Sequence, residues 1–168
     1  MESILSLDHI YYSYHDKNGE TPVINDLSFE IKPGSFTSIV GPSGCGKSTL
    51  LSLLCDLIKP EAGTIYIRPP ENNTDSRMGY MLQKDNLFEW RSIYKNVMLG
   101  LEINNKKTPE NIAYVNHLLE QYDLAEFKSA RPSQLSGGMR QRAALIRTLA
   151  LKPVSYTHLR AHETLSDL

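Results

Sequence analysis

The segment GPSGCGKST, Gly41 to Thr49, constrains the fold of this chain more than any other feature. It follows Phe36 to Val40, a segment typical of a short strand, and it precedes leucines with helical spacing. Glycines in such a loop let the backbone approach phosphate oxygens, while successive N–H groups and the helix N-terminus attract anions. This order of elements predicts a phosphate-binding loop and weighs against the alternative, a strand-to-helix turn that binds nothing.

Two side chains in this loop have the chemistry that a nucleotide requires. Lys47 supplies a point charge for the β- and γ-phosphates, and the hydroxyl of Ser48 is a ligand for Mg²⁺. The candidate nucleotide-binding residues of the loop are Gly41, Pro42, Ser43, Gly44, Cys45, Gly46, Lys47, Ser48 and Thr49.

A second anion site is predicted at LSGGMRQR, Leu135 to Arg142. Ser136 offers a hydroxyl, and Gly137 and Gly138 allow close backbone approach at the N-terminus of the helix that begins there. A γ-phosphate fits such a site, although an ordinary Ser-Gly-Gly helix start is the simpler alternative. The helical spacing predicts a buried side made of Met139, Ala143, Ile146 and Ala150.

Composition narrows the class of protein. With 168 residues, 40% hydrophobic content and a formal net charge of -1, the chain suits one soluble globular domain and gives no reason to expect nucleic acid as the main partner. The N-terminus lacks the charge and the apolar run of a secretory signal. The longest apolar segment, Leu50 to Ile58, is too short to span a membrane, so we expect membrane contact through a partner. Cys45 and Cys55 have no metal-binding spacing and indicate a reduced, cytosolic setting.

Alternating strand-like and helical patterns predict an α/β fold. One predicted helix covers Leu50 to Ile58 and ends at Pro60 and Gly63. Another begins at Thr108 and Pro109 as N-cap and first residue, and its apolar positions are Ile112, Val115, Leu119 and Tyr122. The predicted strands are Ser28 to Ile31, Phe36 to Val40, Thr64 to Ile67 and Gly79 to Leu82.

The phosphate loop followed by LSGGMRQR resembles the ATP-binding subunit of ABC transporters, from Ile4 to about Pro153. The resemblance implies a P-loop NTPase (ABC ATPase) fold: a three-layer core, an antiparallel β subdomain and a helical signature subdomain at about 84–140. Residues 1–153 would be the N-terminal portion of this nucleotide-binding domain, incomplete at its C-terminus. ATP and Mg²⁺ are the implied cofactors.

The resemblance also implies partners and a location. In this family two subunits enclose two ATP molecules, each between one phosphate loop and the signature of the other subunit, so a homodimer is expected. Further expected partners are transmembrane permease subunits and, indirectly, a periplasmic or extracellular solute-binding protein, with no nucleic acid. The expected location is the cytoplasmic face of the cell membrane, as a peripheral protein.

Two further site residues follow from the resemblance alone. Tyr14 matches the aromatic residue that stacks on adenine, with Tyr12 as the fallback, although a tyrosine in a strand can simply pack in the core. Gln83 matches the glutamine that contacts Mg²⁺ and its water and senses the membrane subunit; alone, it would be an ordinary solvated residue.

The segment Phe88 to Gly100, FEWRSIYKNVMLG, is similar to the nitrate, sulfonate and taurine importer branch of the family. Trp90, Ile93 and Val97 would equally serve as generic packing residues. Arg131 departs from the family, which more often has an aromatic residue there, and we expect only a local effect.

The final segment departs from the family most. Where the family has an aliphatic strand that ends in Asp-Glu and, later, a switch histidine, residues 154–168 read VSYTHLRAHETLSDL. His158 and His162 provide too few ligands for a closed metal site. The segment Val154 to Thr164 instead resembles the in-frame translation of a transposon-based sequencing adapter, so we expect a non-native tail.

Three expectations about function follow. The full-length parent is expected to hydrolyse ATP and to energise an importer of a small solute. The chain as printed is expected to bind nucleotide weakly and not to turn it over, because the hydrolytic residues are missing and unpaired strand edges and apolar faces would be exposed. A non-hydrolysing nucleotide-binding regulator is the alternative. A DNA-repair ATPase fits less well, since no long coiled-coil insertion lies between Gly46 and Leu135.

Overall fold

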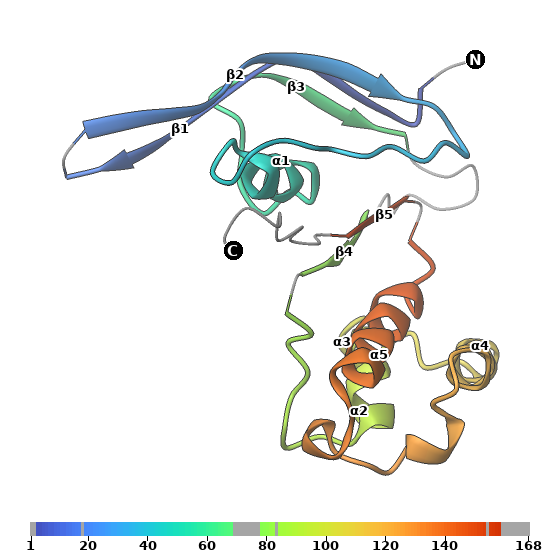
Figure 1. The fold of residues 1–168 in the computed structure, drawn as a ribbon. Coiled ribbons are helices and arrows are strands. Elements are labelled where there is room, and N and C mark those ends of the chain that lie inside the picture. Colours follow the sequence, from blue (N-terminus) through green and yellow to red (C-terminus); the bar gives the residue numbers. More distant parts are fainter. Residues whose placement is uncertain (1–2, 18, 69–77, 83, 154, 159–168) are drawn as a thin grey trace. The chain divides into compact units, whose positions relative to one another are not determined.

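The computed structural model describes residues 3–17, 19–68, 78–82, 84–153 and 155–158. The chain divides into two compact units, Met1–Met78 and Gly79–Leu168 (Figure 1). No helix in the described ranges has the length and apolar character required to span a membrane.

The first unit is built on an antiparallel sheet of three strands, β1 (Leu5–Asp16), β2 (Gly19–Ile31) and β3 (Ala62–Ile67), in the order β2-β1-β3. Strand β1 is central and alternates buried with more exposed residues, so Leu5 and Leu7 point into the core. A register shift after Leu7, with His9 at φ 49°, brings Ile10 to the buried face as well. The predicted strands Ser28 to Ile31 and Thr64 to Ile67 are confirmed as parts of β2 and β3.

Helix α1 (Lys47–Leu54) follows the phosphate loop, as predicted, but it is shorter than the sequence indicates. Cys55 caps its C-terminus and Asp56 adopts a left-handed φ of 59°, which ends the helix before Pro60 and Gly63 are reached. Leu57, which the periodicity places on the buried stripe, is 63% exposed. The predicted end of this helix was therefore wrong.

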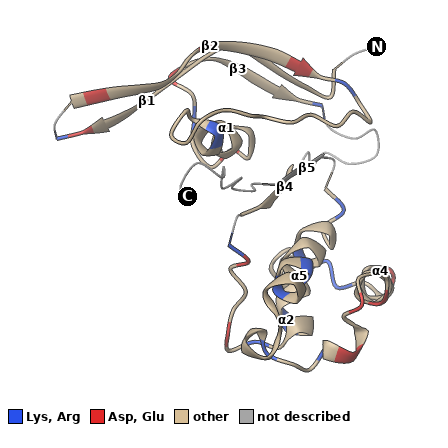
Figure 2. Ribbon diagram, in the orientation of Figure 1, with Lys and Arg blue, Asp and Glu red and all other residues tan. Residues whose placement is uncertain are grey.

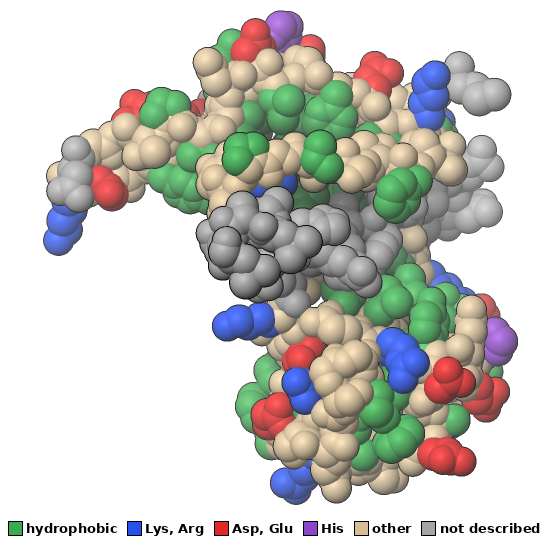
Figure 3. Space-filling view, in the orientation of Figure 1, with side chains coloured by type: hydrophobic (Ala, Val, Ile, Leu, Met, Phe, Trp, Pro, Cys, Tyr) green, Lys and Arg blue, Asp and Glu red, His purple; other side chains and the backbone are tan. Residues whose placement is uncertain are grey.

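The predicted strand Phe36 to Val40 is absent from the structure. No strand in the described part of the chain pairs with it, and a strand without a partner leaves its backbone N–H and C=O groups to water. Phe36 is 96% exposed and Val40 is 84% exposed. Figure 3 shows hydrophobic side chains at the surface along the segment that leads to α1. The sequence of this segment suits a strand, but the described residues leave Phe36 and Val40 largely exposed.

The second unit contains mainly helices. Its elements are β4 (Met78–Met81), α2 (Ile93–Val97), α3 (Leu99–Ile103), α4 (Pro109–Gln121), the 3-10 helices η1 (Ala125–Phe127) and η2 (Pro132–Gln134), α5 (Gly137–Leu149) and β5 (Ser155–His158). Strand β4 confirms the prediction of Gly79 to Leu82 within one residue and pairs with β5, so Ser155–His158 of the predicted tail form a strand.

One hydrophobic cluster holds the second unit together. It contains buried residues from α2, α3, α4 and α5. Helix α4 begins as predicted, because the Thr108 hydroxyl accepts a hydrogen bond from the N–H of Asn111 and Pro109 is its first residue. Val115 and Leu119 are fully buried, which confirms its predicted apolar face. Ile93 and Val97 of α2 are also fully buried and act as packing residues.

Candidate functional site

The phosphate loop lies in the first unit, between the uncovered segment 36–40 and α1. Gly44 and Gly46 have left-handed φ values of 80° and 93°, and the N–H of Cys45 donates to the carbonyl of Pro42 at 3.4 Å. Gly46 is the N-cap of α1 and provides no side-chain cap. The first N–H groups of α1 therefore have no capping side chain and remain available to an anion, as the sequence predicts.

Gly46 is required by its conformation and by its close approach to β2. A Cβ atom at this position would lie 2.9 Å from Cγ1 of Val23 and 3.2 Å from its carbonyl oxygen. A side chain at φ 93° would also strain the backbone. The turn into α1 is thus held against the sheet by a residue without a side chain.

The ammonium of Lys47 contacts its own loop. Its Nζ atom donates to the carbonyl oxygens of Gly41 and Pro42, both at 2.7 Å, and lies 3.6 Å from Sγ of Cys45. The charge is therefore held over the loop, where a bound phosphate would offer it stronger, charged acceptors.

The two tyrosines considered for adenine lie together on β1. Tyr14 is half exposed, and its hydroxyl is 3.2 Å from Oγ1 of Thr49 in the first turn of α1. The ring of Tyr12 meets that of Tyr14 edge to face, with centroids 5.2 Å apart. The structure therefore brings Tyr14 to the phosphate loop, while Thr49 is buried and engaged with it.

The donors present suit Mg²⁺ held together with phosphate. Ser48 is exposed in the first turn of α1, where its hydroxyl is a hard oxygen ligand of the kind that Mg²⁺ prefers. When bound, Mg²⁺ would neutralise the phosphate oxygens that the loop surrounds. Gln83, the other predicted ligand, lies outside the described residues.

The signature segment begins α5 in the second unit. Ser136 is the N-cap, and its hydroxyl accepts from the N–H of Met139 at 3.3 Å. Gly137 and Gly138 are exposed, and a Cβ atom at Gly138 would meet nothing within 4 Å. Leu135 is buried just before the cap and anchors this exposed helix start.

The opposite side of α5 is its buried face. Ala143, Ile146 and Ala150 are at most 1% exposed, which confirms the predicted stripe, and Met139 packs against the same cluster. Because the glycines are exposed and the apolar side chains are buried, the positive N-terminal end of α5 lies at the surface.

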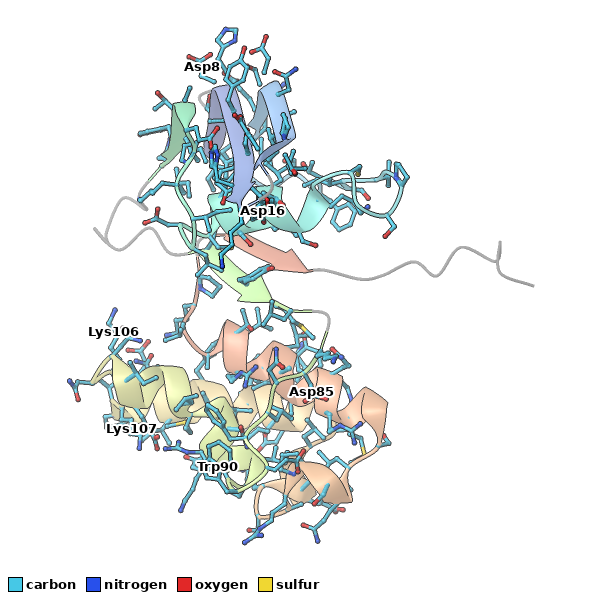
Figure 4. All side chains as sticks on the ribbon, turned by 90° about the vertical axis from the view of Figure 1, so that its left-hand side faces the viewer. Asp8, Asp16, Asp85, Trp90, Lys106 and Lys107 are labelled. Atoms are coloured by element: carbon cyan, nitrogen blue, oxygen red, sulfur yellow. The ribbon has the colours of Figure 1, made fainter. Side chains whose placement is uncertain are left out.

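Two arginines of α5 hold the loop that follows position 83, and sequence reasoning missed them. Nε of Arg140 donates to the Asp85 carboxylate at 3.1 Å, and the guanidinium of Arg147 donates to the carbonyls of Asp85 and Asn86 at 2.8 and 2.7 Å. Burial lowers the pKa of Arg147, and the Asp85 charge opposes this shift. Figure 2 colours the positions of basic residues on α5 blue, and Figure 4 labels Asp85. The spacing of seven residues, two helical turns, was the available signal.

Asn96 is a second residue that sequence reasoning missed. It is fully buried, its Oδ1 accepts from the N–H of Phe88 at 2.7 Å, and its Nδ2 donates to the carbonyls of Phe88, Arg91 and Ser92. One side chain thus fixes the backbone of residues 88–92. This loop presents Trp90, which is 72% exposed and has its ring centroid 4.7 Å from that of Phe88.

The sequence and the fold were compared with known protein families and solved structures. The ABC transporter family model matches residues 24–156. The fold resembles cbiO1 from Clostridium perfringens, part of the ABC transporter complex cbiONQ, with a TM-score of 0.74 and 27% identity over 91% of this chain and 63% of that one. It also resembles a dimeric ATP-binding cassette bound to ADP and Pi, with a TM-score of 0.74 and 30% identity over 89% and 70% of the two chains. The chain belongs to the ATP-binding domains of the ABC transporter family and has the P-loop NTPase fold.

Curated relatives agree with this assignment. An uncharacterized ABC transporter ATP-binding protein, YtlC of Bacillus subtilis, is 45% identical over 90% of this chain and 58% of its own length. A taurine import ATP-binding protein, TauB of a Jannaschia species, is 39% identical over 80% of this chain and 51% of its own. A sulfate/thiosulfate import protein, CysA of Gloeobacter violaceus, is 37% identical over 80% and 40%. The chain spans about half the length of the curated relatives it matches.

Proposed function

We propose that this chain is part of an ATP-binding subunit that energises the import of a small solute. The phosphate loop carries the proposal: an uncapped α1 N-terminus, Lys47 held above the loop and Tyr14 at the first turn form one site in the first unit. These groups suit the phosphates and the base of ATP, with Ser48 and Gln83 proposed as contacts of Mg²⁺.

The proposed solute is a small oxyanion or sulfonate, of the nitrate, sulfonate or taurine kind. Two observations support it: the segment Phe88 to Gly100 is similar to that importer branch, and relatives named for taurine and sulfate import align with most of the chain. The solute itself would be selected by other subunits, so growth of a deletion strain on taurine or nitrate as sole source of sulfur or nitrogen tests this part.

The proposed assembly is a homodimer on permease subunits at the cytoplasmic face of the membrane, with a solute-binding protein acting indirectly. The exposed start of α5 supports it, because Ser136, Gly137 and Gly138 offer an anion site that a second subunit's ATP would fill. Cross-linking of full-length subunits through cysteines placed at Ser43 and Gly137 tests this dimer: ATP should increase the yield, and an unchanged yield contradicts it.

For the chain as printed we propose nucleotide binding without turnover, because residues 1–168 contain neither the Asp-Glu step nor the switch histidine of the family. ATPase rates of this chain and of a full-length version should differ, and equal rates would refute the proposal. If the full-length version also lacks turnover, the alternative of a non-hydrolysing regulator is favoured.

ATP binding is tested by Lys47→Ala. Removal of a charged hydrogen-bond donor should weaken the binding of MgATP by about 2 kcal/mol, or roughly thirtyfold, in calorimetric titration. Lys59→Ala is the matched control, because Lys59 lies just beyond α1 and pairs with Asp56 outside the loop. Equal loss in both variants would contradict the assigned role of Lys47.

The origin of residues 154–168 stays a proposal from the sequence, and sequencing of the genomic locus tests it. We expect the native gene to depart from this segment and to encode an aliphatic strand ending in Asp-Glu. A genomic read with these same codons and a native stop would refute it.

A further inference from the structure

Three side chains with metal-binding atoms converge at one end of the sheet in the first unit, and they are not among the residues assigned to the nucleotide site. They are His15 at the end of β1, Glu20 at the start of β2 and Glu61 just before β3. One ligand atom from each lies within 4.8 Å of the other two. Nε2 of His15 is 2.6 Å from Oε1 of Glu61. Figure 4 labels Asp16, which follows His15 at the end of β1.

The backbone explains this convergence. His15 and Glu20 are directly opposite each other in the antiparallel β1–β2 pair, so their side chains share one face of the sheet. The N–H of Glu61 donates to the carbonyl of Tyr11 at 2.9 Å, which fixes the start of β3 beside β1. All three positions therefore rest on paired strands within one unit.

A buried hydroxyl group, that of Ser13, orients the carboxylate of Glu20 through a hydrogen bond. Ser13 is 7% exposed, and its Oγ donates to Oε1 of Glu20 at 2.7 Å. Because side chains alternate along a strand, Ser13 and His15 share a face while Tyr14 lies on the other. The edge-to-face contact of Tyr12 with Tyr14, and the contact of Tyr14 with Thr49, place the phosphate loop on that other face.

We propose that His15, Glu20 and Glu61 form a binding site for a divalent transition metal, of which Zn²⁺ is the natural probe. An imidazole nitrogen with two carboxylate oxygens suits zinc, whereas Mg²⁺ and Ca²⁺ prefer oxygen alone. Zinc bonds of about 2.0–2.1 Å set ligand atoms about 3.4 Å apart in a tetrahedron, so small rotamer changes accommodate the ion. Water fills the fourth position of this exposed site.

The chain offers a matched control in His9. Its ring also lies near two carboxylates, with Nδ1 2.5 Å from Asp26 and Nε2 3.9 Å from Asp8. These carboxylates stand at opposite nitrogens of the ring, so one ion cannot take all three groups. The side chains of His9 and His15 are similarly exposed. The two sites therefore differ in whether the two carboxylates lie close enough to each other to bind the same ion as the imidazole.

The test is titration of the whole chain with Zn²⁺, followed through the ring-nitrogen NMR signals of its histidines. The Nε2 signal of His15 should shift at a lower Zn²⁺ concentration than the signals of His9. Glu20→Gln and Glu61→Gln should each weaken binding at His15 about tenfold or more, and Ser13→Ala by a similar factor, while His9→Ala leaves it unchanged.

Several results would overturn the proposal. They are an unshifted His15 signal, equal responses of His9 and His15, or unchanged affinity at His15 in both glutamine variants. The backbone amide signals of β1 in each variant report whether the sheet is folded. If Ser13→Ala disturbs the sheet, the glutamine variants at the two exposed positions decide the outcome by themselves.

Discussion

Two helix N-termini in this chain are predicted to face phosphate, and the structure supports them in different ways. The start of α5 is capped by Ser136, anchored by Leu135 and joined to a continuous hydrophobic cluster. The start of α1 has no side-chain cap, and the segment 36–46 before it is largely exposed. The ammonium of Lys47 donates its hydrogen bonds to the carbonyls of its own loop.

This difference indicates which contacts stabilise the conformation of each site. The signature helix is held by side chains packed within its own unit, so its conformation does not require a ligand. The phosphate loop has local hydrogen bonds and close contacts with β1 through Tyr14 and with β2 at Val23, so a bound nucleotide would contribute much of its order. Substitutions in the two units test this contrast.

The largest effect is expected for Ile146→Ala in α5. Ile146 is fully buried, so its truncation should destabilise the second unit by about 2 to 5 kcal/mol through lost burial and a cavity. Phe36→Ser, before the phosphate loop, should change stability by less than about 0.5 kcal/mol, because Phe36 is already exposed. Urea unfolding followed by circular dichroism measures both, and equal losses would break the comparison.

Arg147→Ala should destabilise the same unit by about 1 to 3 kcal/mol, because two carbonyls of the loop at Asp85 and Asn86 lose a charged donor. Arg147→Lys retains the charge but not the two-pronged geometry and should recover only part of the loss. Hydrogen exchange of the loop amides measures this effect. Full recovery by lysine would show that charge alone matters.

Ser136→Ala should cost about 1 kcal/mol, since it removes the cap of α5. Ser136→Asp keeps an acceptor and adds a favourable charge at the helix N-terminus, so it should retain stability. Thermal unfolding compares the two variants, and indistinguishable midpoints would mean that the cap contributes nothing.

The smallest effect concerns Glu102, whose pKa is lowered from 4.5 by the ammonium of Lys107 and then by Arg91. A lowered pKa in the folded state means stability that is present above the unfolded pKa and lost as the pH falls through the folded value. Glu102→Gln should therefore cost about 0.2 to 1 kcal/mol at pH 7 and nothing in acid. Glu120→Gln on α4 controls for the removed charge; a pH-independent difference would contradict this account.

Features encoded within a few residues were predictable. The Thr108-Pro109 start of α4, the Ser136 start of α5 and the loop that leads into α1 all appear where the sequence places them, because capping and glycine conformations act over one helical turn. Features that depend on distant partners were not. The strand at Phe36 to Val40 was predicted from its own residues, without a partner strand. The hydrogen bonds of Arg147 to the loop at Asp85, and of Asn96 to residues 88–92, depend on which backbone segment packs beside each helix.

The family, the phosphate loop and the signature helix could be recognised from the sequence, since each rests on short motifs whose backbone chemistry is local. The fold was needed to show that α1 stops at Leu54, that the hydroxyl of Tyr14 lies beside Thr49, and that His15, Glu20 and Glu61 converge. Residues far apart in the chain meet through strand register and packing. Local composition does not specify these pairings, because the same residues are compatible with several registers.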